Sequence, residues 1–458
     1  MTQRFAFSTG KAFLAFFALF ALTTLCPADN GFKQLFNGKD INGWIKRGGD
    51  ATYTVEDGCI VGKRGDGPNT FLCSPGEYGN FVLYFECKFD ESINSGVQFR
   101  SSARKAGERE VVFGYQCELD QDSGNSGRVY DESRRGRWIS NLENDVTKDA
   151  FIKNDWNKLV IQAIGPCIKI WVNGVICSDF ADTADLKGFF GLQVHGSNSP
   201  TGKVRWRNIW IKELPPTEWQ KLLKPDFKDI WVSPSGKWEM DDQLVAKGTS
   251  ARNETRDGML RFEEILKDHA ARVTFKQVNG NSGLYFRAVE VDKPHWMGGF
   301  QNEIDRKATG SLWEVGYAAP EFRGRGWVAQ NTEMAEKVFK EGDWNTVSIV
   351  AVGDRLITEL NGQIIIDIVD PECIKEGKVA LQLHGGSDME YYFKDFDILV
   401  FDDEQRAMIE NVEMPQPEFS EASAAPEARQ IAPARRPLQR FRPLIQGARE
   451  PRVSRLRR

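Results

Sequence analysis

The residues of this chain best suited to acid–base chemistry lie on a short alternating segment. In the stretch YQCELD every second residue is a glutamine or a carboxylate, namely Gln116, Glu118 and Asp120. Because successive side chains of a β-strand point to opposite faces, these three share one face and the apolar residues between them share the other. Carboxylates two positions apart on a strand lie about 7 Å apart at their Cα atoms, so each can shift the pKa of the other, and the two can take acid and base roles.

Two further segments repeat this pattern. Alternation places Gln98 and Arg100 on one face of NSGVQFR, and Gln193 and His195 on one face of GLQVHG. A histidine on that face could move a proton near neutral pH. We therefore predict a sheet with one apolar face and a polar groove on the other. The alternative is an ordinary antiparallel sheet whose solvated face carries surface ion pairs.

The same groove would suit a sugar. Amide and carboxylate groups supply the donors and acceptors that hydroxyls need, and aromatic side chains such as Tyr130 and Trp138 could stack on pyranose rings. Packing in the core or at its rim is the simpler explanation for each aromatic residue taken alone. A carbohydrate-binding function without catalysis therefore stands beside the catalytic interpretation.

The polar segments occur twice, because the chain contains an internal repeat with an offset of 183 to 189 residues. NSGVQFR matches NSGLYFR, FGYQCELD matches GGFQNEID, SGRVYDE matches TGSLWEV and GLQVHGS matches ALQLHGG. In the second copy Trp313 takes the place of Tyr130. The candidate binding residues of that copy are Arg287, Gln301, Glu303, Asp305, Gln382 and His384.

Each repeat is long enough for a complete domain, unlike the short units of a solenoid. Alternating runs follow one another without regular helical segments, and the Asn-Gly pairs at 173–174 and 361–362 are typical of two-residue hairpin turns. Consecutive prolines at 215–216 predict a linker. We expect two tandem all-β domains, at residues 31–214 and 225–401, each a two-sheet jelly-roll sandwich.

The two ends of the chain differ from its body. Residues 1–28 contain an apolar run too short to span a bilayer, which predicts a signal peptide and a secreted, periplasmic or cell-envelope protein with no transmembrane span after its removal. Residues 411–458, rich in Pro, Ala and Arg, predict a disordered tail. The stretch 428–458 carries ten Arg and one Glu, which leaves a net charge of −14 on the rest of a chain whose total is −5. This acidic body excludes nucleic-acid binding by the folded domains, whereas the Arg-rich tail could contact an anionic envelope component.

Metal and disulfide chemistry are weakly indicated. The sequence contains no zinc-binding or Cys-x-x-Cys motif. The stretch DQDSGN, which begins at Asp120, has oxygen donors of the kind that Ca²⁺ prefers but not the spacing of a helix–loop–helix calcium site. We expect no cofactor, with a divalent metal such as Ca²⁺ as the alternative. The cysteines after residue 28 are expected to be buried apolar residues, and one or two disulfides in the first repeat are the alternative.

Taken together, LFNGKDINGW, VEDGCIVG, NSGVQFR, YQCELD, SGRVYDE, DWNKL, WVNG and LQVHGS resemble the 3-keto-disaccharide hydrolase domain family. The resemblance is strong over residues 31–214 and weaker over the second copy, whose opening FKDIWVSPSGKW departs from the LFNGKDINGW signature. It implies an exported bacterial protein with a concanavalin A-like jelly-roll fold. It also implies a hydrolase of the glycosidase type that cleaves 3-keto-glycosides or disaccharides, by hydrolysis or by elimination followed by hydration.

Such a substrate suggests roles for the groove. A ketone at C3 acidifies the proton on C2, so a base can form an enolate that expels the C1 substituent, after which water adds. Our hypothesis gives base or acid roles to His195 and to Glu118 or Asp120, enolate stabilisation to Arg100, and sugar contact to Tyr130. The second copy is expected to be active, altered or only a binding module. The rival interpretation of the whole chain is a non-catalytic, lectin-like carbohydrate-binding protein, because a jelly roll does not fix the chemistry of its site.

Overall fold

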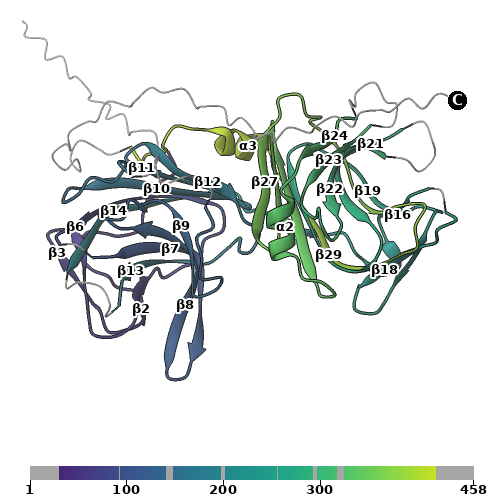
Figure 1. Ribbon diagram of the computed structural model, residues 1–458. Helices are drawn as coiled ribbons and strands as arrows, with labels where there is room; N and C mark the ends of the chain where they lie inside the picture. The colour runs from purple at the N-terminus through teal and green to yellow at the C-terminus, as the bar shows by residue number, and fades with distance from the viewer. Residues whose placement is uncertain are drawn as a thin grey trace, which may run out of the picture.

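Two β-sandwiches follow one another along the chain (Figure 1). The computed structural model describes residues 30–91, 93–140, 148–196, 202–254, 256–291, 297–316 and 324–418. The predicted signal peptide at 1–28 lies outside these residues, as does the predicted tail beyond residue 418. Among the helices described, none is long and apolar enough to cross a membrane. The predicted fold class, two tandem all-β sandwiches of the jelly-roll type, is confirmed.

Domain 1 consists of a back sheet and a front sheet, both antiparallel. The back sheet has the order β12 (Val175–Ala181), β11 (Cys167–Val172), β10 (Asn157–Ile164), β6 (Phe81–Phe89), β14 (Lys203–Glu213), β4 (Cys59–Lys63) and β3 (Thr52–Glu56), and β1 (Lys33–Gln34) also pairs with β14. The front sheet has the order β2 (Ile45–Gly48), β5 (Thr70–Cys73), β13 (Phe189–Val194), β7 (Ser95–Ala106), β8 (Arg109–Leu119) and β9 (Val129–Glu132). All three polar segments singled out above belong to this front sheet.

Domain 2 repeats the strand order of domain 1 and adds one edge strand to the front sheet. Its back sheet runs β17 (Lys237–Met240), β18 (Ala246–Ser250), β29 (Met389–Val400), β20 (His269–Asn279), β25 (Asn345–Val352), β26 (Arg355–Leu360) and β27 (Gln363–Val369), with β15 (Gln220–Lys221) paired to β29. Its front sheet runs β16 (Ile230–Val232), β19 (Gly258–Leu266), β28 (Gly377–Leu383), β21 (Ser282–Glu290), β22 (Met297–Ile304), β23 (Leu312–Val315) and β24 (Gly326–Ala329). The described helical segments are η1 (Pro225–Phe227), α2 (Thr332–Val338) and α3 (Asp403–Glu410).

The apolar faces of the two sheets meet in the core of each domain. In domain 1, Val97 of β7, Cys117 of β8 and Leu192 of β13 are buried in one cluster with Phe85 and Trp206 of the back sheet. Strand alternation predicted that these three front-sheet residues would lie on the face opposite the glutamines and Glu118. Their burial in the core confirms that prediction at these positions. All seven cysteines among the described residues are free, and six of them are buried.

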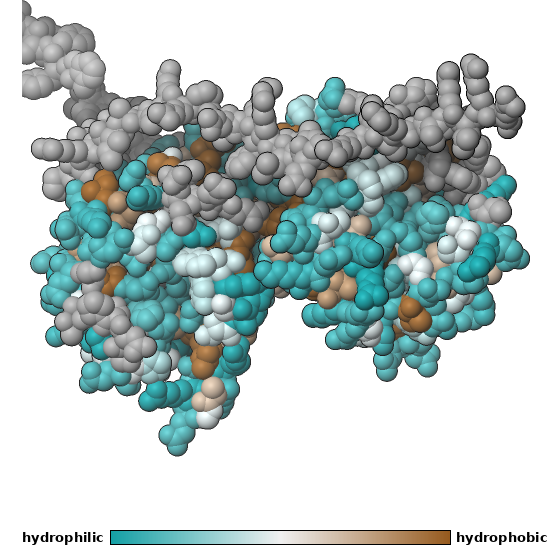
Figure 2. All heavy atoms as spheres, in the orientation of Figure 1, coloured by the Kyte–Doolittle hydropathy of each residue, from teal (hydrophilic) through white to brown (hydrophobic). Residues whose placement is uncertain are grey.

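An apolar cluster also joins the two domains. It combines Ile164 and Ala181 of domain 1 with Ile357, Leu399 and Phe401 of domain 2. Figure 2 shows apolar residues along the line where the domains meet. Burial of this surface favours one fixed arrangement of the domains over two independent units.

The end of the described chain returns from domain 2 to the back sheet of domain 1. Helix α3 begins with a capping box made by Asp402 and Gln405. Beyond it, the Nζ atom of Lys169 donates to the carbonyl oxygens of Ile409 (2.6 Å) and Asn411 (2.8 Å), and the indole of Trp171 donates to that of Val412 (3.1 Å). The first residues of the segment predicted to be a disordered tail therefore lie bound against domain 1, because buried donors of its back sheet find their acceptors there.

Candidate functional site

A buried carboxylate lies on the front sheet of domain 1, on the strand next to the β9 edge. Glu118, on β8, is 7% exposed. One of its oxygens accepts a hydrogen bond from Asn94 Nδ2, and the other accepts one from Gln116 Nε2 at 3.0 Å. Both of these side-chain partners are amides, so neutral donors solvate the carboxylate, and no described residue forms an ion pair with it.

Three glutamines on neighbouring strands complete this network. Gln98 Nε2 and Gln193 Nε2 both donate to Gln116 Oε1, at 2.9 and 2.8 Å, and Ser101 Oγ donates to Gln98 Oε1 at 2.7 Å. All three glutamines are at most 3% exposed. An ordinary solvated strand face is therefore excluded, because a set of buried and mutually bonded amides is costly to assemble unless it is fully satisfied or used by a ligand.

The glycine of the NSG motif makes room for the network. Gly96 lies between Gln193 of β13 and Glu118 of β8 in the strand register. A Cβ atom at Gly96 would approach Gln116 Cγ to 2.7 Å. The side chain of Gln116 therefore lies over this glycine, and this position lets it reach Glu118.

Burial shifts the ionisation of Glu118. Removal of the carboxyl from water raises its pKa to about 7, because burial disfavours the charged form. The hydrogen bonds from Gln116 and Asn94 oppose this shift, whereas the negative charges of Asp120 and Glu132 add to it. A carboxyl with such a pKa can both accept and donate a proton at neutral pH.

This shift predicts a pH-dependent stability. Glu118 and its counterpart Glu303 both have a pKa of about 7 in the folded protein, against 4.5 for a free glutamate. Between these values the folded protein holds protons that the unfolded chain releases, so the free energy of unfolding falls as pH rises, by at most about 1.4 kcal/mol per pH unit for each group. We expect the free energy of unfolding, measured with urea between pH 5 and 8, to decline less with rising pH in the double variant Glu118→Gln, Glu303→Gln than in the unmodified protein. Identical slopes would contradict the buried-carboxyl description.

Two polar atoms next to the network lack a protein partner. His195 follows β13, and its Nδ1 is buried without a hydrogen bond in the described part of the chain. The same is true of Gln193 Oε1. Val194 pairs with Ser95, so His195 and Asn94 occupy the next positions along these two strands. The structure thus brings His195 to the side of the network where Asn94 contacts Glu118.

Glu132 and Asn69 belong to this face of the sheet and were missed by the sequence reasoning. Glu132, at the end of β9, accepts a hydrogen bond from Asn69 Nδ2 at 3.3 Å, which links the β5 and β9 sides of the face. Tyr130 of β9 lies beside Gln116 in the register and makes an edge contact with Trp138, whose ring is 37% exposed. The motif SGRVYDE places Tyr130 and Glu132 on one face of a strand, which was the available signal for Glu132.

Arg100 does not join this cluster. A register shift in β7 between Phe99 and Ser102 and a φ of 45° at Arg100 interrupt the strand alternation. The guanidinium instead donates to the carbonyl oxygens of Gly79 (2.9 Å) and Gly165 (2.5 Å), and Arg100 is fully buried. The placement of Arg100 on the same face as Gln98 is therefore corrected: the bulge turns its side chain away from the amide network.

Asp120 caps a turn at the end of β8. Its Oδ1 accepts from the backbone N–H groups of Asp122 (2.7 Å) and Ser123 (3.0 Å). Asp122 is paired in turn with Lys153 at 2.9 Å. Among the residues that the structure describes, no group of three or more His, Cys, Asp or Glu side chains is placed to hold a metal ion.

Domain 2 carries the same central network. Glu303 is 6% exposed and accepts from Asn281 Nδ2 and from Gln301 Nε2 (3.1 Å), and burial raises its pKa to about 7. Gln301 also donates to Gln382 Oε1 at 3.3 Å. Gly283 repeats the role of Gly96, since a Cβ there would meet Gln301 at 2.5 Å.

The lining of this second site is different. Tyr285 stands at the position of Gln98, and its hydroxyl accepts from Gln382 Nε2 at 3.2 Å. Val315 stands at the position of Glu132, so the second carboxylate is absent from this position. Trp313 packs edge-on against Trp327, which is 40% exposed.

The remaining predicted residues of domain 2 make hydrogen bonds of their own outside the Glu303–Gln301–Gln382 set. Arg287 repeats the conformation of Arg100, with φ 45° and a hydrogen bond to the carbonyl oxygen of Gly353 at 2.9 Å. Asp305 accepts from the backbone of Lys307 at 2.8 Å, as a turn cap. His384 is exposed, and its Nδ1 lies 2.7 Å from the carbonyl oxygen of Gly385.

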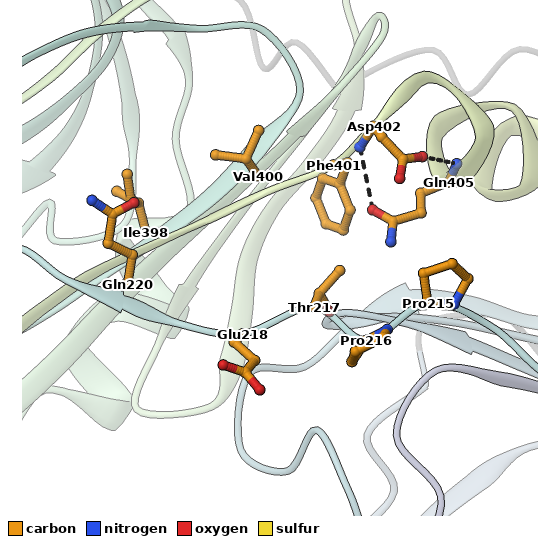
Figure 3. A pocket seen from close by; sticks show the side chains of 10 residues that line it. All are labelled: Pro215, Pro216, Thr217, Glu218, Gln220, Ile398, Val400, Phe401, Asp402 and Gln405. Carbon is orange, nitrogen blue, oxygen red and sulfur yellow. Dashed lines mark hydrogen bonds between the residues drawn. The ribbon is translucent and has the colours of Figure 1, made fainter.

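A separate crevice of about 380 Å³ lies between the interdomain linker and the start of α3 (Figure 3). Pro215, Pro216, Ile398, Val400 and Phe401 form much of its lining. The polar groups of Asp402 and Gln405 bond to each other in the capping box. These two polar groups therefore serve to cap α3, and none of the residues of the Glu118 or Glu303 networks lines the crevice.

Residues 31–212 and 218–399 each match the sequence profile of the 3-keto-alpha-glucoside-1,2-lyase-like domain. No curated protein matches the chain. Among solved structures, a candidate glycosyl hydrolase from Parabacteroides distasonis is 21% identical, with 40% of this chain and 94% of that one covered and a TM-score of 0.30. A carbohydrate-binding module from Bacillus subtilis is 16% identical, with 37% and 93% covered and a TM-score of 0.28. A Bacillus subtilis protein of unknown function with a galectin-like fold is 13% identical, with 40% and 100% covered and a TM-score of 0.32.

Proposed function

Because this chain belongs to the 3-keto-alpha-glucoside-1,2-lyase-like family, we propose that domain 1 cleaves glycosides whose sugar carries a ketone at C3. The observation that carries the proposal is the buried carboxyl of Glu118, which is held by Gln116 and Asn94 and has a pKa near neutral. A base with a pKa near the working pH is what removal of an acidified C–H proton requires.

Glu118 takes the proton from C2 in this scheme. The electron pair of that C–H bond forms an enolate with the C3 carbonyl. When the carbonyl re-forms, this electron pair makes a C1–C2 double bond and the C1–O bond breaks. The departing oxygen takes up a proton, for which His195 is the proposed donor. Addition of water across the double bond would complete net hydrolysis, and release before this addition would make the reaction a lyase reaction.

The neutral amides of the network fit the remaining needs of this reaction. Gln98, Gln116 and Gln193 place amide groups on three adjacent strands of one rigid sheet. Amide donors held in place before reaction stabilise a developing enolate oxygen better than water, which must reorient. Arg100 has no part in this scheme, because carbonyl oxygens of the scaffold already occupy its guanidinium.

For domain 2 we propose sugar binding without turnover. Glu303 and its amide partners remain there, but Val315 replaces the wall carboxylate Glu132. Tyr285 and the Trp313–Trp327 pair give this site a more aromatic lining than that of domain 1. Aromatic rings suit stacking on a sugar ring, whereas Val315 leaves this site without the second carboxylate that Glu132 supplies in domain 1.

The test is incubation of the two-domain protein with a 3-keto-glucoside and, separately, with the unoxidised glucoside. Release of the aglycone from the keto compound alone supports the proposal, and mass analysis of the sugar product separates elimination from hydrolysis. Binding of both compounds without release would favour a lectin-like protein. The same reactions with a chelator determine whether a divalent metal takes part.

A further inference from the structure

We propose that the hairpin turn 361–363 of domain 2 acts as a positioning element for the catalytic site of domain 1. The inference rests on the function proposed above for that site. It concerns the wall segment, defined as residues 130–138, which contains Tyr130, Glu132 and Trp138. Domain 2 would then contribute to the domain 1 reaction without touching the substrate.

The wall segment is bound directly to this turn. Arg135 Nη1 and Arg137 Nη2 each donate to the carbonyl oxygen of Gly362 at 3.0 Å. Arg137 Nη1 also contacts Gln363 Oε1. Both arginines follow Glu132 by only a few residues and precede Trp138, so the part of the wall between these two site residues is fixed by domain 2.

Arg135, together with Arg134, also fixes the strand that carries the site residues. Asp131 is fully buried on the face of β9 opposite Tyr130 and Glu132. It accepts from Arg134 Nε at 2.9 Å and is paired with Arg135. Arg135 additionally donates to Asp182, beyond β12, at 2.7 Å. One guanidinium thus connects β9, the body of domain 1 and the turn of domain 2, and its loss would remove one link of the wall segment to each of them.

The glycine of the turn is required by this contact. Gly362 has φ +69°, and a Cβ atom there would lie 2.5 Å from Arg135 Nη1. The corresponding Asn-Gly turn of domain 1 contains Gly174, with φ +86° and nothing within 4 Å of a Cβ. Alanine imposes similar backbone strain at both glycines, but only at Gly362 would its methyl group also push the Arg135 guanidinium from the position in which it holds the wall segment.

These two glycines provide a matched experiment. We expect Gly362→Ala to raise KM and lower kcat for a 3-keto-glucoside, with kcat/KM reduced about tenfold or more, because small displacements of positioning groups have large effects on rate. Gly174→Ala should keep both constants while losing a similar amount of stability. Hydrogen exchange of residues 129–138 should be about tenfold faster in Gly362→Ala than in Gly174→Ala. Equal kinetics and equal exchange in the two variants would overturn the proposal.

A second pair of variants separates positioning from general loosening of the interface. Arg137→Ala removes a contact of the wall segment, whereas Arg355→Ala removes an interdomain contact elsewhere, in which Arg355 Nη2 donates to the carbonyl oxygen of Asp179 at 2.8 Å. Loss of kcat/KM in Arg137→Ala alone supports the proposal, and equal loss in both overturns it. If the unmodified protein turns over no keto-glucoside, the proposed function fails, and the hydrogen exchange of residues 129–138 still decides the positioning role.

Discussion

Replacement of Glu118 by glutamine is expected to lower kcat for a 3-keto-glucoside by about 10²- to 10⁴-fold, which is the usual contribution of a positioned acid–base group. The amide keeps the shape and much of the hydrogen bonding of the carboxyl, so sugar affinity should change little. Isothermal calorimetry and steady-state kinetics on the same preparation measure the two effects separately. A parallel loss of affinity and turnover would mean that Glu118 binds the sugar and does not act as the base.

Glu303→Gln is the matched control, because Glu303 has the same amide partners and a similarly raised pKa. Turnover should stay close to that of the unmodified protein if domain 1 performs the chemistry. The pH profile provides a further check: with Glu118 as base, kcat should fall as pH is lowered through about 7, where its carboxyl becomes protonated. A rate that is lost in Glu303→Gln and kept in Glu118→Gln would assign the reaction to domain 2.

Arg100→Met is expected to lower the free energy of unfolding by about 3 to 5 kcal/mol, because several buried acceptors lose their donor at about 1 to 3 kcal/mol each. Methionine approximates the length of the arginine stem but leaves the carbonyl oxygens of Gly79 and Gly165 without this donor, and it removes one of the donors to Asn80 Oδ1. The positive φ at Arg100 adds strain that the guanidinium contacts now hold in place. Urea unfolding followed by tryptophan fluorescence measures the change.

Arg109→Met on the exposed part of β8 controls for the loss of a positive charge and should be nearly neutral. Arg287→Met should repeat the large effect in domain 2, since Arg287 has the same φ and equivalent backbone acceptors. A stable Arg100→Met protein that no longer turns over substrate would contradict the structural role and restore Arg100 as an enolate-stabilising residue.

The repeat, the all-β fold and the central part of the site could be predicted from the sequence because they depend on local periodicity. Residues two apart on a strand share a face, so Gln116 and Glu118 had to lie together once YQCELD was recognised as a strand. The matching motifs then placed Gln301 and Glu303 in the same way in the second copy. The family match over both repeats confirms the resemblance that these motifs indicated.

Local periodicity failed where the chain departs from a regular strand. A bulge in β7 turned Arg100 into the scaffold. The bulge does not change the residue types in the pattern, so alternation alone still placed the Arg100 side chain in the groove. Backbone geometry of this kind is decided by what the side chain can contact after the sheets have packed.

The sequence by itself thus determined which side chains share a face, because that property needs only the strand repeat. Only the tertiary structure decided how far those faces are buried, and hence that Glu118 has a raised pKa. The tertiary structure alone also joined Asn69 to Glu132, and Arg137 to Gly362 across the domain boundary. These pairs are far apart in the chain, and their contacts form only when sheets and domains pack, so no short-range pattern encodes them.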